Sequence, residues 1–147
     1  MRRRRLRGAI DAASFGGFLI IIGYVWFAHP NIFSDIGDTF RRLAEEQVFR
    51  PSRTLVVPAY TFLFLLALRD VLLGALRAAA SQASRRVVKE FFAAAAYAGI
   101  GYLMFQFSSG TLTGPLLILY TFLTAGILVV IYGAIGYTLE RRALSVS

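Results

Sequence analysis

The chain has 147 residues but no cysteine and only one histidine. Without cysteine there is no disulfide framework and no thiolate for metal binding or nucleophilic attack. One histidine cannot supply both axial ligands of a bis-histidine haem within one chain. The sequence also lacks a Gly-rich phosphate loop and a G-x-S-x-G nucleophile motif. We therefore expect a non-catalytic protein with no cofactor and no bound metal.

Hydrophobic residues are abundant and are gathered in long blocks. They make up 57% of the chain, and the mean hydropathy is +0.63, against roughly 45–50% apolar residues in a typical soluble domain. A bilayer-spanning helix needs about 20 mostly apolar residues. Four blocks meet this requirement, at about residues 9–28, 55–76, 91–107 and 116–139. The sequence predicts an all-α integral membrane protein, a four-helix bundle forming one domain of four transmembrane helices.

The segment between the first two blocks, residues 31–50, has a different pattern. Its apolar residues recur at helical spacing, and acidic and basic residues occupy most of the other positions. This pattern predicts an amphipathic helix lying on the outer membrane surface. The alternative is a helix packed over the mouth of the bundle.

The net charge of +8 is distributed unevenly along the chain. Twelve of the 16 basic residues lie in the N-terminal tail, in the C-terminal tail, or between residues 69 and 89. Because the cytoplasmic side carries the excess of Lys and Arg, this bias predicts cytoplasmic N- and C-termini in the plasma membrane. The expected partners are the lipid bilayer and anionic lipid headgroups on the cytoplasmic face, and no nucleic acid.

Two short sequences recur in the spans. The first is I-G-Y-x-x-F, at residues 22–27 and 100–105, and the second is Y-T-F-L, at 60–63 and 120–123. The two copies of each sequence fall at corresponding places in two predicted helical hairpins. This correspondence indicates an internal duplication about a two-fold axis along the membrane normal. Chance recurrence in a chain rich in Gly, Tyr and Phe is the alternative.

Arg69 and Asp70 interrupt the apolar run of the second span. Each costs about 2.5–3.5 kcal/mol at a helix centre on insertion scales, so an ionisable pair there is a candidate functional site. The alternative is that the span ends near Leu68 and places the pair among headgroups. Gln106 belongs to a polar cluster that either lines a vestibule or forms a solvated turn, and we group it with the pair as a candidate polar site.

Small residues within the spans predict close helix packing, since they let helix backbones approach each other in a membrane. The spacing leaves open whether the packing is within one chain or between chains. The predicted packing residues are Gly16, Gly23, Ala95, Gly99, Gly126 and Gly133.

Two functions fit these patterns. The first is a structural or accessory subunit of a membrane complex, or a homo-oligomeric scaffold. The second is a small oligomeric ion channel or transporter that uses Arg69 and Asp70. The layout of four spans, an outer amphipathic segment and a basic middle link resembles that of small phosphate-starvation-inducible membrane proteins. No residue motif carries this resemblance, and it implies no reaction.

Overall fold

The computed structural model describes residues 2–46, 53–80 and 84–144, which form five α-helices. Four of these helices contain a segment long and apolar enough to cross a membrane, at Gly8–Ala28, Thr54–Ala79, Arg85–Ser108 and Gly114–Thr138. The prediction of an all-helical chain with four such helices is confirmed. The helices are α1 (Arg2–Ala28), α2 (Ile32–Glu46), α3 (Arg53–Ala79), α4 (Ser84–Ser108) and α5 (Gly114–Leu144).

Helix α4 begins several residues before the predicted span at 91–107. Its first turns contain the charged residues Arg85, Arg86, Lys89 and Glu90. Hydropathy alone places a boundary at Phe91, but Arg, Lys and Glu are good helix formers and continue the helix. The amphipathic segment is helical over Ile32–Glu46, and its predicted end at residues 47–50 lies outside the described residues.

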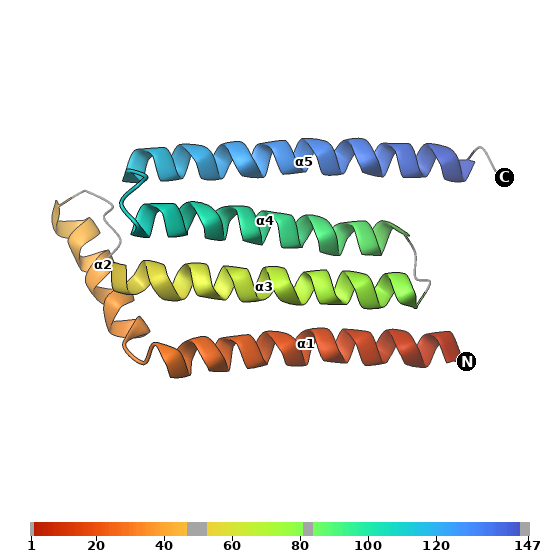
Figure 1. The fold of residues 1–147 in the computed structure, drawn as a ribbon, viewed down its shortest axis with the longest axis horizontal. Helices are drawn as coiled ribbons and strands as arrows, with labels where there is room; N and C mark the ends of the chain where they lie inside the picture. Colours follow the sequence, from red (N-terminus) through yellow and green to blue (C-terminus); the bar gives the residue numbers. More distant parts are fainter. Residues whose placement is uncertain (1, 47–52, 81–83, 145–147) are drawn as a thin grey trace.

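The four long helices lie side by side in one layer, in the order α1, α3, α4, α5 (Figure 1). Each runs antiparallel to its neighbour, so the start of α1, the end of α3, the start of α4 and the end of α5 lie at one end of the layer. Helix α2 and the α4–α5 turn lie at the other end. Gly110 in that turn has φ = 81°, a left-handed conformation that glycine adopts without steric cost. The turn makes α4 and α5 antiparallel neighbours, as the short connection predicts.

The prediction of a four-helix bundle left open which helices are neighbours. Within the described residues, the main packing of the long helices joins α1 to α3, α3 to α4 and α4 to α5. The two predicted hairpins therefore follow each other along a row, related by a shift and not by a two-fold axis (Figure 1). Helix α3 contacts α1 through one side and α4 through another, and α1 and α5 form the two free edges.

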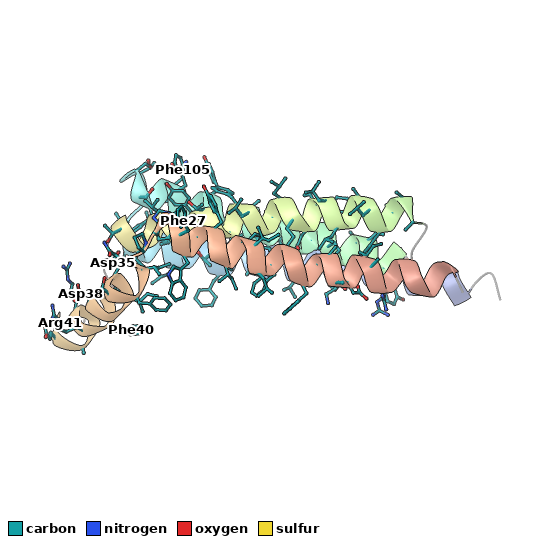
Figure 2. The ribbon with its side chains drawn as sticks, turned by 90° about the horizontal axis from the view of Figure 1, so that it is seen from below. Phe27, Asp35, Asp38, Phe40, Arg41 and Phe105 are labelled. Atoms are coloured by element: carbon teal, nitrogen blue, oxygen red, sulfur yellow. The ribbon has the colours of Figure 1, made fainter. Side chains whose placement is uncertain are left out.

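Helix α2 leaves the layer at His29-Pro30-Asn31, where proline cannot continue the hydrogen bonding of α1. The rings of Trp26 and Phe33 meet edge to face, with centroids 4.8 Å apart, and hold the start of α2 against α1. Beyond this contact α2 points obliquely away from the layer (Figure 2). Phe40 is 68% exposed, on a helix that also carries Asp38 and Arg41 as an exposed ion pair.

Small residues form the closest contact between α3 and α4. A Cβ atom built on Gly101 would lie 3.3 Å from the Leu63 Cβ and 3.3 Å from the ring of Phe64. Near the other end, a Cβ on Gly74 would lie 3.1 Å from the ring of Phe91. These glycines allow the two backbones to approach more closely than a larger side chain permits.

Most other large apolar side chains point outward from the layer. Phe27 is 87% exposed and Phe122 is 75% exposed, and α5 is covered with exposed Leu, Ile and Val along its length. In water such a surface costs about 25 cal/mol per Å². A bilayer removes this cost, so the layer has the surface of a multi-pass membrane protein.

Gly101→Leu should lower the free energy of unfolding by about 1–3 kcal/mol, because the new side chain overpacks the α3–α4 contact. Gly126→Leu is the matched control, since nothing lies within 4 Å of a Cβ built there. Both changes gain similar helix propensity. Thermal unfolding in one detergent measures the difference, and equal stability of the two variants would contradict the packing.

Candidate functional site

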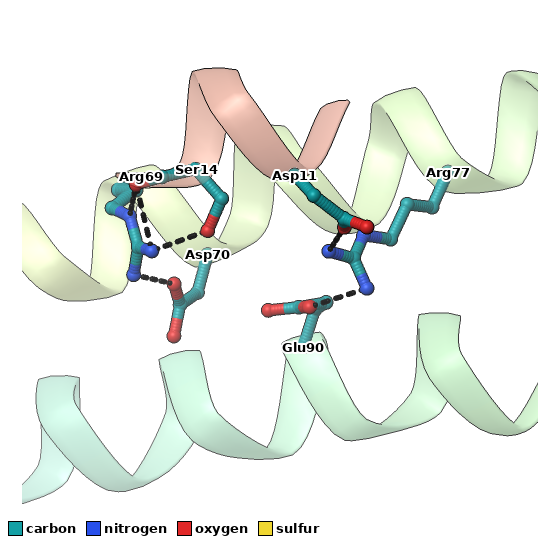
Figure 3. Close-up of polar contacts among 6 residues, drawn as sticks. All are labelled: Asp11, Ser14, Arg69, Asp70, Arg77 and Glu90. Carbon is teal, nitrogen blue, oxygen red and sulfur yellow. Dashed lines mark hydrogen bonds and ion pairs between the residues drawn. The ribbon is translucent and has the colours of Figure 1, made fainter. Parts of the chain in front are cut away.

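Arg69 of α3 is the centre of a polar cluster that reaches into α1. Its Nε and Nη2 atoms donate to the Ser14 carbonyl oxygen at 3.1 and 2.9 Å, and Nη2 also donates to the Ser14 hydroxyl (Figure 3). Gly17, one turn after Ser14, lies beside the Arg69 side chain, and a Cβ there would be 3.8 Å from its Cδ. Gly17 therefore lies at van der Waals distance from the arginine side chain that reaches the α1 backbone.

Asp70 follows Arg69 directly but faces a different side of α3, since successive helical residues differ by about 100° in direction. The residue is 3% exposed, and its side chain lies between α3 and α4 (Figure 3). Arg69 links the α1-facing and α4-facing sides of α3, because its Nη1 donates to the Asp70 Oδ1 at 2.8 Å. One guanidinium thus satisfies both a backbone carbonyl on α1 and a carboxylate facing α4.

Arg77 forms a second ionic centre seven residues later, about 10 Å along the helix at 1.5 Å per residue. It contacts Asp11 of α1 at 3.0 Å and Glu90 of α4 at 3.0 Å (Figure 3). The Arg77 side chain is 11% exposed. Its Nε is buried and has no hydrogen-bond partner in the described part of the chain. Arg77 therefore joins the helices on both sides of α3.

These residues form one unit, which we call the ionic cluster: Asp11, Ser14, Arg69, Asp70, Arg77 and Glu90. It contains three carboxylates and two guanidiniums on α1, α3 and α4 (Figure 3). All of it lies in the half of the layer nearer to the chain ends and the α3–α4 link. The described residues contain no group of three or more His, Cys, Asp or Glu side chains that could hold a metal ion.

The sequence singled out Arg69 and Asp70, and the structure brings them together inside the layer. Helix α3 continues past this pair to Ala79. Sequence reasoning missed the partners Ser14, Arg77 and Glu90. The seven-residue spacing of Asp70 and Arg77, which places both on one helix face, was the available signal.

Gln106 does not join the ionic cluster. It lies sixteen residues after Glu90 on α4, about 24 Å further along the helix. Its Nε2 donates to the Tyr102 hydroxyl of the same helix at 2.6 Å. The nearby Ser108 and Ser109 hydroxyls donate to the carbonyls of Phe105 and Gln106, one turn earlier. These polar residues complete the end of α4 before the turn.

The predicted packing glycines have mostly open surroundings. A Cβ at Gly16, Gly23, Gly126 or Gly133 would meet nothing within 4 Å, and Ala95 is exposed. Gly99 alone of the predicted set packs inside the chain, 3.2 Å from the Thr124 Cγ2. Packing of the others between chains stays a prediction. The close contacts at Gly74 and Gly101 were missed, since composition does not tell which side of a helix faces a neighbour.

Comparison of the chain with known protein families, with curated proteins and with solved structures finds no match. The argument for function therefore rests on the geometry of the chain itself.

The Arg69–Asp70 pair should show strong coupling in a double-mutant cycle. Arg69→Met leaves the Asp70 carboxylate buried without its partner, which costs about 3 kcal/mol. Asp70→Leu costs less, because Arg69 keeps its bonds to Ser14. The double variant should therefore be much more stable than the sum of the two single losses predicts.

Unfolding of the purified protein in mixed micelles measures these values. Ser14→Ala is the control that removes one hydroxyl and keeps the carbonyl acceptor, with an expected loss of about 0.6 kcal/mol. Additivity of the two single variants within about 0.5 kcal/mol would contradict the coupling.

Proposed function

We propose that the protein is a non-catalytic integral membrane protein that acts as an accessory subunit of a membrane complex or as a homo-oligomeric scaffold. The observation that carries this proposal is the ionic cluster, in which the charged groups of the spans are directed at one another. Arg69 and Arg77 contact α1, and Arg77 also contacts α4. Side chains used in this way connect helices, so the cluster has a structural use without any substrate.

The open layer supports association with further helices. Among the residues that the structure describes, a single row leaves the outer sides of α1 and α5 without a partner helix. Both sides combine exposed aromatic and aliphatic residues with glycines, such as Gly23 and Gly126. Membrane helices associate through such small residues.

The proposed location is the plasma membrane, with both termini cytoplasmic. The described positions support a common side, since the start of α1, the basic start of α4 and the end of α5 lie at one end of the layer (Figure 1). Excess Lys and Arg favours the cytoplasmic side. Helix α2 then lies at the outer face, where its exposed Phe33 and Phe40 enter the membrane interface.

Anionic lipids are the proposed lipid partners at the cytoplasmic end. A groove of about 320 Å³ runs between α4 and α5, and its lining is mostly apolar, with Lys89 at the basic end. Such a groove can take an acyl chain while the ammonium contacts a phosphate. Each Lys or Arg near an anionic surface contributes about 1 kcal/mol.

Native mass spectrometry of the protein extracted gently from its own membrane tests the proposal. We expect either a closed homo-oligomer or a defined complex with other polypeptides. A monomer that carries only lipid, at protein concentrations where known membrane complexes stay intact, would contradict both forms of the proposal.

A small oligomeric channel or transporter is the second candidate, favoured by the depth of Asp70. This carboxylate is buried in the middle third of α3 and adjoins the Arg77–Glu90 pair, so acidic and basic groups follow one another toward the chain ends (Figure 3). Toward the other end, Leu63, Phe64 and Gly101 fill the α3–α4 contact with apolar atoms. A path across the membrane therefore requires a second copy or a partner.

Ion and proton flux into liposomes separates the two candidates. For the structural function we expect wild-type flux no greater than that of protein-free liposomes under proton, sodium and potassium gradients. A channel or transporter would show flux that Asp70→Asn changes while assembly is kept. Asp38→Asn, on exposed α2, is the matched control because it removes a carboxylate outside the spans.

A further inference from the structure

The α3–α4 contact is built from the two recurring sequences. The Y-T-F-L sequence of α3 supplies Tyr60 and Leu63, and the I-G-Y-x-x-F sequence of α4 supplies Gly101 and Phe105. The Gly101 position lies 3.3 Å from the Leu63 Cβ, and the rings of Tyr60 and Phe105 meet edge to face at 5.7 Å. The two sequences are therefore complementary halves of one helix–helix interface.

The same two halves occur again on the free edges of the layer. Helix α1 carries the second I-G-Y-x-x-F sequence, where a Cβ on Gly23 would meet nothing within 4 Å and Phe27 is 87% exposed. Helix α5 carries the second Y-T-F-L sequence, with Tyr120 41% and Leu123 55% exposed. Each edge thus presents one half of an interface whose other half is absent from its own surroundings.

The exposed sides of α1 and α5 correspond, residue by residue, to the sides of α4 and α3 that form the α3–α4 contact. On α4, Ala94 and Gly101 are buried, and the equivalent residues of α1 are Gly16 and Gly23, both open. On α3, the buried Ala67 corresponds to Ile127 of α5, which is 51% exposed. The agreement therefore extends along the helices beyond the two short sequences.

Neither uncovered side competes with packing inside the chain. Helix α1 contacts α3 through Ile21 and Val25, which lie on another side of the helix from Gly16 and Gly23. Helix α5 contacts α4 through Thr124. Leu123 precedes Thr124 directly and therefore points about 100° away from it. Tyr120, one turn before Thr124, lies beside the α4 contact and is 41% exposed. Both edges can accept a further helix without rearrangement of the layer.

We propose that a second copy of this chain docks on the layer edge, with its α1 packed against α5 as α4 packs against α3. This inference rests on the proposed scaffold function and specifies its interface. Gly23 of one copy would lie against Leu123 of the next, and Phe27 against Tyr120. Because α4 and α1 run in the same direction, both copies have the same orientation in the membrane. Phe27 and Phe105 lie at the same end of the molecule (Figure 2).

The proposed contact is heterologous, since α1 and α5 are different surfaces. Such contacts close into a ring when the rotation between copies allows it and otherwise extend as a row. The alternative occupant of both edges is lipid. A glycine stripe favours a helix as the occupant, because close backbone approach yields van der Waals packing that acyl chains do not reproduce.

The absence of cysteine allows a cross-linking test on an otherwise unmodified chain. Leu63→Cys with Gly101→Cys is the positive control within one chain, because the 3.3 Å between the two Cβ positions is close to disulfide spacing. Gly23→Cys and Leu123→Cys are the test variants, each made singly and given a different tag. They are co-expressed and oxidised in native membranes, and the products are separated without reductant.

We expect a mixed dimer of Gly23→Cys and Leu123→Cys chains in at least tenfold excess over dimers of either variant alone. A chain carrying both cysteines should give a ladder of higher oligomers or a closed ring. Ile22→Cys with Leu123→Cys is the mismatched control, because Ile22 lines the groove beside α2 and points away from the edge. It should give little product.

Two outcomes would overturn the inference. If native mass spectrometry finds oligomers but the test pair cross-links no better than the mismatched pair, the docking face is wrong and the scaffold function stands. If the protein is monomeric and lipid-bound, with both test cysteines open to alkylating reagents, then the scaffold function fails as well.

Discussion

The guanidinium of Arg69 is the contact on which the arrangement of the first three long helices depends. It lies between α1 and α3, with the Ser14 carbonyl on one side and the Asp70 carboxylate, which faces α4, on the other. On insertion scales the two charges cost about 5–7 kcal/mol together. The hydrogen bonds return about 0.6 kcal/mol each on average, and up to about 1.7. The cluster therefore adds little net stability, and its effect is on which helix turns face one another.

The second ionic centre makes this register unique. Asp11 and Ser14 lie three residues apart on α1, and both must meet arginines of α3 at Arg77 and Arg69. A shift of α1 by one turn along α3 would break both contacts at once and leave charges facing lipid. Apolar packing alone does not provide this selection, since the spans are covered with interchangeable Leu, Ile and Val. The Arg77–Glu90 pair extends the same constraint to α4.

The sequence predicts where the helices of this chain lie much better than it predicts which helices pack together. Apolar length identifies the four long helices, and Pro30 and Gly110 mark two of the turns, because these signals are local. Packing is not local. Gly16 and Gly17 are adjacent, yet only Gly17 lies beside Arg69, since one residue turns the helix face by about 100°. The order of the four helices was not predictable for the same reason. Nothing in the four apolar blocks tells whether the fourth helix closes on the first or continues a row.

The row has a physical consequence that a bundle would not have. A closed bundle buries its small residues inside, whereas a row leaves two edges, and the edges of this row carry the same complementary sequences as its centre. The interface used once inside the chain is therefore present a second time, as two separate halves on the two edges. If the hairpins arose by duplication, their contact was originally between two chains, and the α3–α4 packing preserves it within one. Gly101 has a packing contact with Leu63 inside the chain, whereas nothing in the described residues lies within 4 Å of a Cβ built on Gly23. A glycine in an open helix position lowers helix propensity by about 1 kcal/mol relative to alanine. A neighbouring chain at the α1 edge accounts for that cost, and lipid does not.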